Sequence, residues 1–203
     1  MSFHTVIVSG KSEAKASINS IVSKNKIDII TGMLGLKRGT VNLVSYKKEW
    51  VNEFEKEKKN LERILGDTII SIEHCGSTAI PGLKAKPIID VLVGVKTVKK
   101  EGEYCNAKLD RVKGYYSRNK YFPKKDRFVV AKGNAKVRTH YIHIVRYKGG
   151  IWNKLLRFRD YLKKDKKAMT QYLVLKEKLS LAHPDERRLY TKKKSDFIKK
   201  VLK

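Results

Sequence analysis

Apolar residues recur along this chain with two different periods, and the change from one period to the other predicts a mixed α/β fold. A helical period places Trp50 and Phe54 on one stripe, so residues 47–65 are predicted to form a helix that ends at Gly66. The run 88–95 is almost continuously apolar. It predicts a strand inside a sheet, because a strand covered on both faces carries few polar side chains.

The same patterns place the remaining elements along the chain. Further strands or extended segments are predicted over residues 41–46, 68–73, 115–116, 128–131 and 137–147. Further helices are predicted over residues 97–112, 151–164, 166–182 and 185–202. Together these elements predict an α/β (α+β) domain in which a mixed β-sheet is flanked by helices, with several helices at the C-terminal end.

Composition narrows the class of protein. The 203 residues are 41% hydrophobic, which suffices for the core of one domain. No apolar run is long enough to cross a bilayer and no secretory leader is evident, so no membrane partner is expected. The only cysteines, Cys75 and Cys105, form no disulfide framework. We therefore expect a cytoplasmic protein, whose oligomeric state the sequence leaves open.

Net charge is the most unusual property of the composition. The chain carries a formal charge of +27, and the part after residue 95 holds 33 Lys or Arg against 10 Asp or Glu, a net charge of +23. Such a field attracts RNA or another polyanion in a salt-dependent manner. Two interpretations stay open: lysines that only solvate the surface, or basic residues after position 95 that bind RNA.

The stretch 72–95 carries the clearest candidate chemistry. It predicts a strand, a turn at Gly76-Ser77, a loop, and a second strand that contains a single acid, Asp90. Backbone N–H groups at a tight turn suit phosphate oxygens. A neighbouring carboxylate suits the magnesium ion that accompanies a polyphosphate. The stretch therefore predicts a nucleotide site.

Several ordered motifs in this chain resemble one known family. They are Glu73-His74-x-Gly76-Ser77-Thr78-Ala79-Ile80-Pro81-Gly82-Leu83, Lys86-Pro87-Ile88-Ile89-Asp90, Arg138-Thr139-His140-Tyr141-Ile142-His143-Ile144-Val145 and Phe158-Arg159-Asp160-Tyr161-Leu162. The chain resembles the GrpB family, a group of predicted nucleotidyltransferases. The resemblance implies a nucleotidyltransferase-like domain over residues 33–203. Residues 1–32 then form an N-terminal extension, and whether this extension is part of the fold stays open.

The resemblance also implies an activity and a set of site residues. The protein is expected to be a magnesium-dependent nucleotidyltransferase that transfers a nucleotidyl group from a nucleoside triphosphate to an acceptor. Asp90 is expected to bind Mg²⁺ and to act in catalysis, with Glu73 or His143 completing the site. The residues expected to contact nucleotide phosphates are Gly76, Ser77, Thr78, Lys86 and Arg138.

One position departs from the pattern of the nucleotidyltransferase superfamily, in which Gly-Ser or Gly-Gly precedes an acid-hydrophobic-acid triplet. A second acid would fall at position 92, where this chain has Leu92. Two-metal phosphoryl transfer needs several carboxylates. Glu73 could supply the missing acid if its strand lies beside that of Asp90, or it could form a structural ion pair with Lys84 or Lys86. The alternative function is a non-catalytic nucleotide- or RNA-binding protein with a degenerate nucleotidyltransferase fold.

Only one of the two histidines of the downstream motif can face Asp90, unless a bulge intervenes in the strand. His140 and His143 are three residues apart, so a regular strand directs them to opposite faces. The motif favours His143 as the residue that faces Asp90, with Tyr141 on the same face. Arg138 is expected to share the face of His140.

Overall fold

A computed structural model describes residues 34–119 and 126–202 of the chain, and the predicted extension 1–32 lies outside these residues. Its centre is a six-stranded mixed sheet with the order β2-β3-β6-β5-β4, while β1 also pairs with β6. Among the strands that the structure describes, only β3 and β6 pair in parallel. The strands are β1 (Leu36–Lys37), β2 (Ser71–Cys75), β3 (Ile89–Val95), β4 (Tyr115–Ser117), β5 (Arg127–Gly133) and β6 (Val137–Arg146). The predicted interior strand is confirmed as β3.

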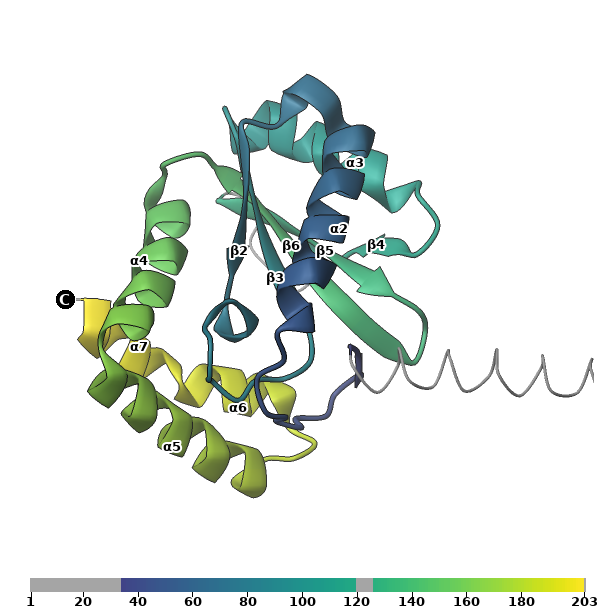
Figure 1. Cartoon of the computed structure of the whole chain (residues 1–203). Coiled ribbons are helices and arrows are strands. Elements are labelled where there is room, and N and C mark those ends of the chain that lie inside the picture. The colour runs from purple at the N-terminus through teal and green to yellow at the C-terminus, as the bar shows by residue number, and fades with distance from the viewer. Residues whose placement is uncertain (1–33, 120–125, 203) are drawn as a thin grey trace, which may run out of the picture. The chain divides into compact units, whose positions relative to one another are not determined.

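Helices cover both faces of this sheet. They are α2 (Glu49–Leu65), α3 (Glu103–Asp110), α4 (Gly150–Lys164), α5 (Lys166–Ala182), α6 (Arg187–Lys193) and α7 (Ser195–Leu202). Figure 1 shows α2 and α3 on one side of the sheet and α4 on the other, with α5 and α6 crossing below one end of the strands. Short turns of 3-10 helix occupy Gly66–Thr68 and Ser77–Ala79, and a π-helical turn occupies Val98–Gly102.

Helix α2 follows its sequence pattern closely. Trp50, Phe54 and Leu61 are buried on its inner stripe, as the helical period predicts. Gly66 has a φ of 58° and ends the helix, because a glycine adopts positive φ without the steric cost of a side chain. Among the described residues, no helix is both long and apolar enough to cross a membrane.

Side chains alternate along the strands, so the two faces of the sheet pack against different helices. His74 and His140 belong to the face that packs against α2, together with the apolar side chains of Val91 and Ile142. Leu92 and its neighbours on the opposite face pack under α4, in a cluster made of Cys75, Leu92, Val145 and Trp152. Asp90 lies on this second face, at the end of the apolar cluster.

Two predicted boundaries are wrong. The segment 41–46, expected to be extended, contributes one isolated bridge, between Val44 and Ala85. The strand expected from residue 68 begins at Ser71, because the amide of Ile69 bonds the Gly66 carbonyl and extends the turn after α2. The last helix, predicted as continuous, is divided into α6 and α7 at Lys194.

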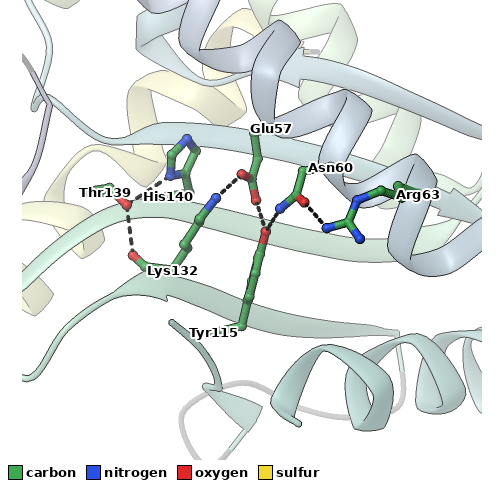
Figure 2. A network of polar contacts seen from close by, with 7 residues as sticks. All are labelled: Glu57, Asn60, Arg63, Tyr115, Lys132, Thr139 and His140. Carbon is green, nitrogen blue, oxygen red and sulfur yellow. Dashed lines mark hydrogen bonds and ion pairs between the residues drawn. The ribbon is translucent and has the colours of Figure 1, made fainter. Parts of the chain in front are cut away.

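A polar network that the sequence analysis did not predict joins α2 to strands β4, β5 and β6 (Figure 2). The buried carboxylate of Glu57 accepts hydrogen bonds from Tyr115 Oη, at 2.7 Å, and from Lys132 Nζ. Asn60 Nδ2 donates to the same tyrosine oxygen at 2.6 Å, and Arg63 donates to Asn60 Oδ1 at 2.9 Å. The network satisfies polar groups that would otherwise be costly to bury under α2.

His140, at the edge of this network, should make stability depend on acid pH. Its ring is 5% exposed, Nδ1 lies 2.9 Å from Thr139 Oγ1, and Nε2 is buried without a hydrogen-bond partner in the described structure. Burial, with help from Lys132 and His74, lowers the pKa of His140 to about 3. The unfolded chain therefore binds the extra proton first, and stability falls as the pH drops from about 6.5 towards 3.

We expect the His140→Gln variant to lose less stability on acidification than the wild-type chain. The difference should be about 2 kcal/mol between pH 7 and pH 5, since one pKa unit corresponds to about 1.4 kcal/mol. Urea unfolding at the two pH values measures it, and comparing each protein with itself cancels the cost of the substitution. Equal losses in both proteins would contradict the assignment.

Candidate functional site

A pocket of about 320 Å³ opens beside Asp90, where β2 ends and β3 begins. It is lined by the turn 76–78 after β2, by residues 85–90 up to the start of β3, by Tyr141 and His143 in the middle of β6, by Arg127 at the start of β5, and by the helices α4 to α7. Its polar and charged lining residues are Ser77, Thr78, Lys86, Asp90, Arg127, Tyr141, His143, Tyr172, Lys176, Arg187, Tyr190, Thr191 and Lys194. Asp90 is the single acid among these described lining residues, against five Lys or Arg side chains.

Gly76 holds the Asp90 carboxylate in place by close approach. The residue has a φ of 72°, a region that L side chains rarely adopt. A Cβ atom built on Gly76 would lie 2.5 Å from Asp90 Oδ2. The site therefore needs glycine here both for the turn and for the space that the carboxylate occupies.

His143 contacts the other oxygen of the same carboxylate. Its Nε2 lies 3.4 Å from Asp90 Oδ1, and its Nδ1 is buried without a hydrogen-bond partner in the described part of the chain. Burial opposes ionisation of Asp90, but His143, Lys86 and Arg187 outweigh burial and lower its pKa. The expectation that His143 rather than His140 faces Asp90 is confirmed.

Glu73 forms an ion pair with a helix that covers the Asp90 face of the sheet. Its Oε2 lies 2.9 Å from Arg159 Nη1 on α4, and that guanidinium also bonds the His74 carbonyl and Asp160. Glu73 is absent from the residues that line the pocket. The ion pair expected with Lys84 or Lys86 is not the one formed, because α4 brings Arg159 closer, and Lys84 pairs instead with Glu177 at 2.7 Å.

Arg138 lies on a different face from the one expected. The pairing of β5 with β6 shifts by one residue at Lys132 and Gly133, and this irregularity breaks the alternation between Arg138 and His140. The guanidinium of Arg138 consequently bonds Tyr141 Oη and, at 3.0 Å, Tyr116 Oη. It is buried behind Tyr141 and does not line the pocket.

Five of the expected phosphate or catalytic residues besides Asp90 do converge on the pocket: Gly76, Ser77, Thr78, Lys86 and His143. The Thr78 hydroxyl is already engaged, at 3.0 Å from His74 Nε2. His74 stacks on Phe54, and burial lowers its pKa to about 4. The contact with His74 thus anchors Thr78, which lines the pocket together with Ser77.

The position of the missing second acid is packed with apolar groups. Leu92 is fully buried against Cys75, Val145 and Trp152. Within residues 34–119 and 126–202, no three His, Cys, Asp or Glu residues come together as metal ligands. The residues therefore do not fit a two-metal centre. They do fit one Mg²⁺ that enters with a nucleotide, since Mg²⁺ is commonly held by one or two carboxylates together with substrate phosphates.

Part of the pocket lining was not predicted from the sequence. Lys176 on α5, Arg187 on α6 and Lys194 just after α6 reach the same space as Asp90. No motif spacing links them to Asp90, because they come from helices far along the chain. Only their closeness in the folded structure identifies them.

Comparison with known proteins gives the chain its relatives. The model of the family described as "GrpB protein" matches residues 40–203. The chain belongs to the GrpB family. The "Glutamate-rich protein GrpB" of Alkalihalophilus pseudofirmus is 36% identical over 171 residues, which cover 84% of this chain and 98% of that protein.

Two further relatives of this GrpB family member agree with the assignment. A crystal structure of conserved protein GrpB from Enterococcus faecalis is similar with a TM-score of 0.70 and 36% identity, covering 79% of this chain and 94% of that one. The UPF0157 protein YqkA of Bacillus subtilis is 34% identical over 164 residues, 78% of this chain and 45% of that longer protein. The fold expected from the sequence is thus confirmed by a solved relative.

Proposed function

We propose that this protein is a magnesium-dependent nucleotidyltransferase that uses a nucleoside triphosphate. The observation that carries the proposal is the charge pattern of the pocket, where Asp90 is the single acid among the described lining residues and lies beside the turn at Gly76 and several cations. Such a pattern suits a polyphosphate that shares one Mg²⁺ with the protein. The cytoplasmic location expected from the sequence agrees with this use of nucleotides.

Each residue at the pocket has a distinct role in this proposal. The backbone at Gly76 and Ser77, with Lys86 beside it, would contact phosphate oxygens. Asp90 would bind the Mg²⁺ that enters with the nucleotide, and the ion would neutralise charge that develops on the transferred phosphorus group. His143 keeps Asp90 ionised and fixes its direction through the contact at Oδ1. Transfer would depend on positioning rather than on a covalent intermediate.

A second candidate function rests on a different observation. Leu92 replaces an acid and is packed into the apolar cluster under α4, so the chain holds one carboxylate where the superfamily pattern has more. A protein that binds nucleotide or RNA without transferring a group would need no second acid. The net charge of +23 after residue 95 favours binding of RNA or another polyanion.

The first test is isothermal titration of the full chain with ATP, GTP, CTP and UTP, with and without Mg²⁺. We expect at least one nucleotide to bind in a magnesium-dependent manner, and Asp90→Asn to weaken that binding about tenfold or more, since bonds to charged groups contribute about 1.5–3 kcal/mol. The control is Asp67→Asn, an exposed acid outside the pocket lining, which should bind like the wild type.

The outcomes separate the two functions. Unchanged magnesium-dependent binding by Asp90→Asn would overturn the role of Asp90 and with it the transferase mechanism. Nucleotide binding that needs neither Mg²⁺ nor Asp90 would favour the non-catalytic binder. RNA retention on filters, measured over a salt series, would test the RNA alternative, which requires binding that falls steeply as salt increases.

A further inference from the structure

Four of the five basic side chains that line the pocket come from the loop before β3 and from the C-terminal helices, and two of them lie over the buried ring of Tyr190. Lys194 Nζ lies 4.6 Å from the ring centroid and Lys86 Nζ lies 5.2 Å from it. Lys176 and Arg187 line the same pocket. Four like charges in one partly enclosed space repel one another, so a protein gains nothing from the arrangement unless an anion compensates it.

Asp90, the one acid among the described lining residues, offsets part of the charge of Lys86 and Arg187 but not that of Lys176. Lys176 is 1% exposed, and its ammonium donates to the backbone carbonyl of Lys84. Glu177, the acid next to Lys176 in sequence, forms its ion pair with Lys84. Buried lysines are rarely stable without a carboxylate partner.

Arg187 also has a polar atom that lacks a hydrogen-bond partner among the described residues. Its guanidinium carbon lies 5.3 Å from the centroid of the Tyr141 ring, and its Nη1 is buried without a hydrogen-bond partner among the described residues. Tyr190 Oη is likewise buried and unpartnered in the described structure. Buried donors of this kind are normally satisfied, and the missing partner is commonly a ligand or water.

The electrostatics of the lysines agree with the geometry. Burial, followed by the charge of Lys194, lowers the pKa of Lys176 to about 7. Burial, followed by Arg187 and Lys194, also holds the pKa of Lys86 well below its usual value. An anion in the pocket would favour the charged form of both lysines, which is the behaviour expected of a binding site rather than of a solvated surface.

We propose that Lys86, Lys176, Arg187 and Lys194 form a built site for a chain of linked phosphates, and that this site binds the chain without Mg²⁺. The inference rests on the proposed function only in taking a phosphate chain as the ligand. It adds that the C-terminal helices, rather than the turn at Gly76 alone, supply most of the charge that holds the chain. Arg187 Nη1 then gains an acceptor, and Asp90 stays available for a metal ion.

The test uses inorganic tripolyphosphate as the probe, titrated calorimetrically into the full chain in the presence of EDTA. We expect binding by the wild type and a loss of about tenfold or more in both Arg187→Gln and Lys194→Gln. The matched control is Lys192→Gln, an exposed residue on the same helix, which should bind like the wild type. Asp90→Asn should bind at least as tightly as the wild type, since it removes the one negative charge.

Two results would overturn the proposal. The first is a Lys192→Gln variant that weakens binding as much as Arg187→Gln does, which would assign the affinity to general surface charge. The second is normal tripolyphosphate binding by both Arg187→Gln and Lys194→Gln, with thermal unfolding midpoints that match the wild type. Because Lys194 is partly exposed, its substitution keeps the test valid even if Arg187→Gln unfolds.

The same experiment separates this proposal from the nucleotidyltransferase function. Metal-free tripolyphosphate binding that depends on Arg187 and Lys194, without any magnesium-dependent nucleotide binding, would support the site and reject the transferase. Magnesium-dependent nucleotide binding that requires Asp90, with tripolyphosphate binding unaffected by the cation variants, would support the transferase and reject the site.

Discussion

The Gly76→Ala variant should lose magnesium-dependent nucleotide binding and be destabilised by about 2–4 kcal/mol. Part of the stability loss comes from the backbone at φ 72° and ψ −171°, a region that is essentially restricted to glycine and costs another residue about 1–3 kcal/mol. The rest comes from the contact of 2.5 Å between a new Cβ and Asp90 Oδ2, which the carboxylate can relieve only by moving. Movement would break the contact of Asp90 Oδ1 with His143 Nε2. Urea unfolding and nucleotide titration measure the two effects.

Gly82 provides a matched control on the same loop. It has a φ of 79°, and no atom lies within 4 Å of the position its Cβ would take. Gly82→Ala should therefore show the backbone cost alone, about 1–2 kcal/mol, and keep nucleotide binding. If Gly76→Ala retained binding, or if the two variants were equally destabilised, the close approach of Gly76 to Asp90 would not be what holds the site together.

The second large effect is expected at Glu57, outside the pocket. Glu57→Gln should destabilise the fold by about 2–4 kcal/mol, because it removes the charge that compensates Lys132 and one of the acceptors of the network in Figure 2. Glu57 is 2% exposed, so water cannot replace the lost interactions. Urea unfolding gives the difference in the free energy of unfolding.

Glu53, one turn earlier on α2, is the control for this substitution. Its ion pair with Lys56 lies at the surface, where such pairs contribute about 0–1 kcal/mol. Glu53→Gln should change stability by less than about 0.5 kcal/mol. A Glu57→Gln variant as stable as Glu53→Gln would show that the network adds nothing to the fold. Nucleotide binding should survive in both variants, because Glu57 packs on the face of the sheet opposite Asp90.

Local signals in the sequence were sufficient where one element determines its own structure. The helix predicted over residues 166–182 is α5, and Gly66 ends α2 as predicted, since periodicity and a positive-φ glycine act within a few residues. The turn with Gly76 and the interior strand with Asp90 were also predicted together. Their motif is contiguous, so pairing of β2 with β3 brings the two residues into contact without help from the rest of the chain.

Interactions between distant elements were not predictable in the same way. The shift in pairing between β5 and β6 moved Arg138 to the face of Tyr141, and the sequence contains no separate signal for it. Glu73 could pair with any nearby cation, and the packing of α4 selected Arg159. In both cases the preferred partner depends on where another element packs, which local propensity does not specify.

The sequence by itself therefore determined the family, the order of the elements and the core of the site, Gly76, Asp90 and His143. Those residues lie in motifs whose geometry follows from strand alternation and a tight turn. Only the tertiary structure decided that Lys176, Arg187 and Lys194 face the same pocket, because the packing of α5 and α6 across the end of the sheet sets their distance from Asp90. Charge along a sequence shows how many cations a chain has, whereas folding decides which of them meet.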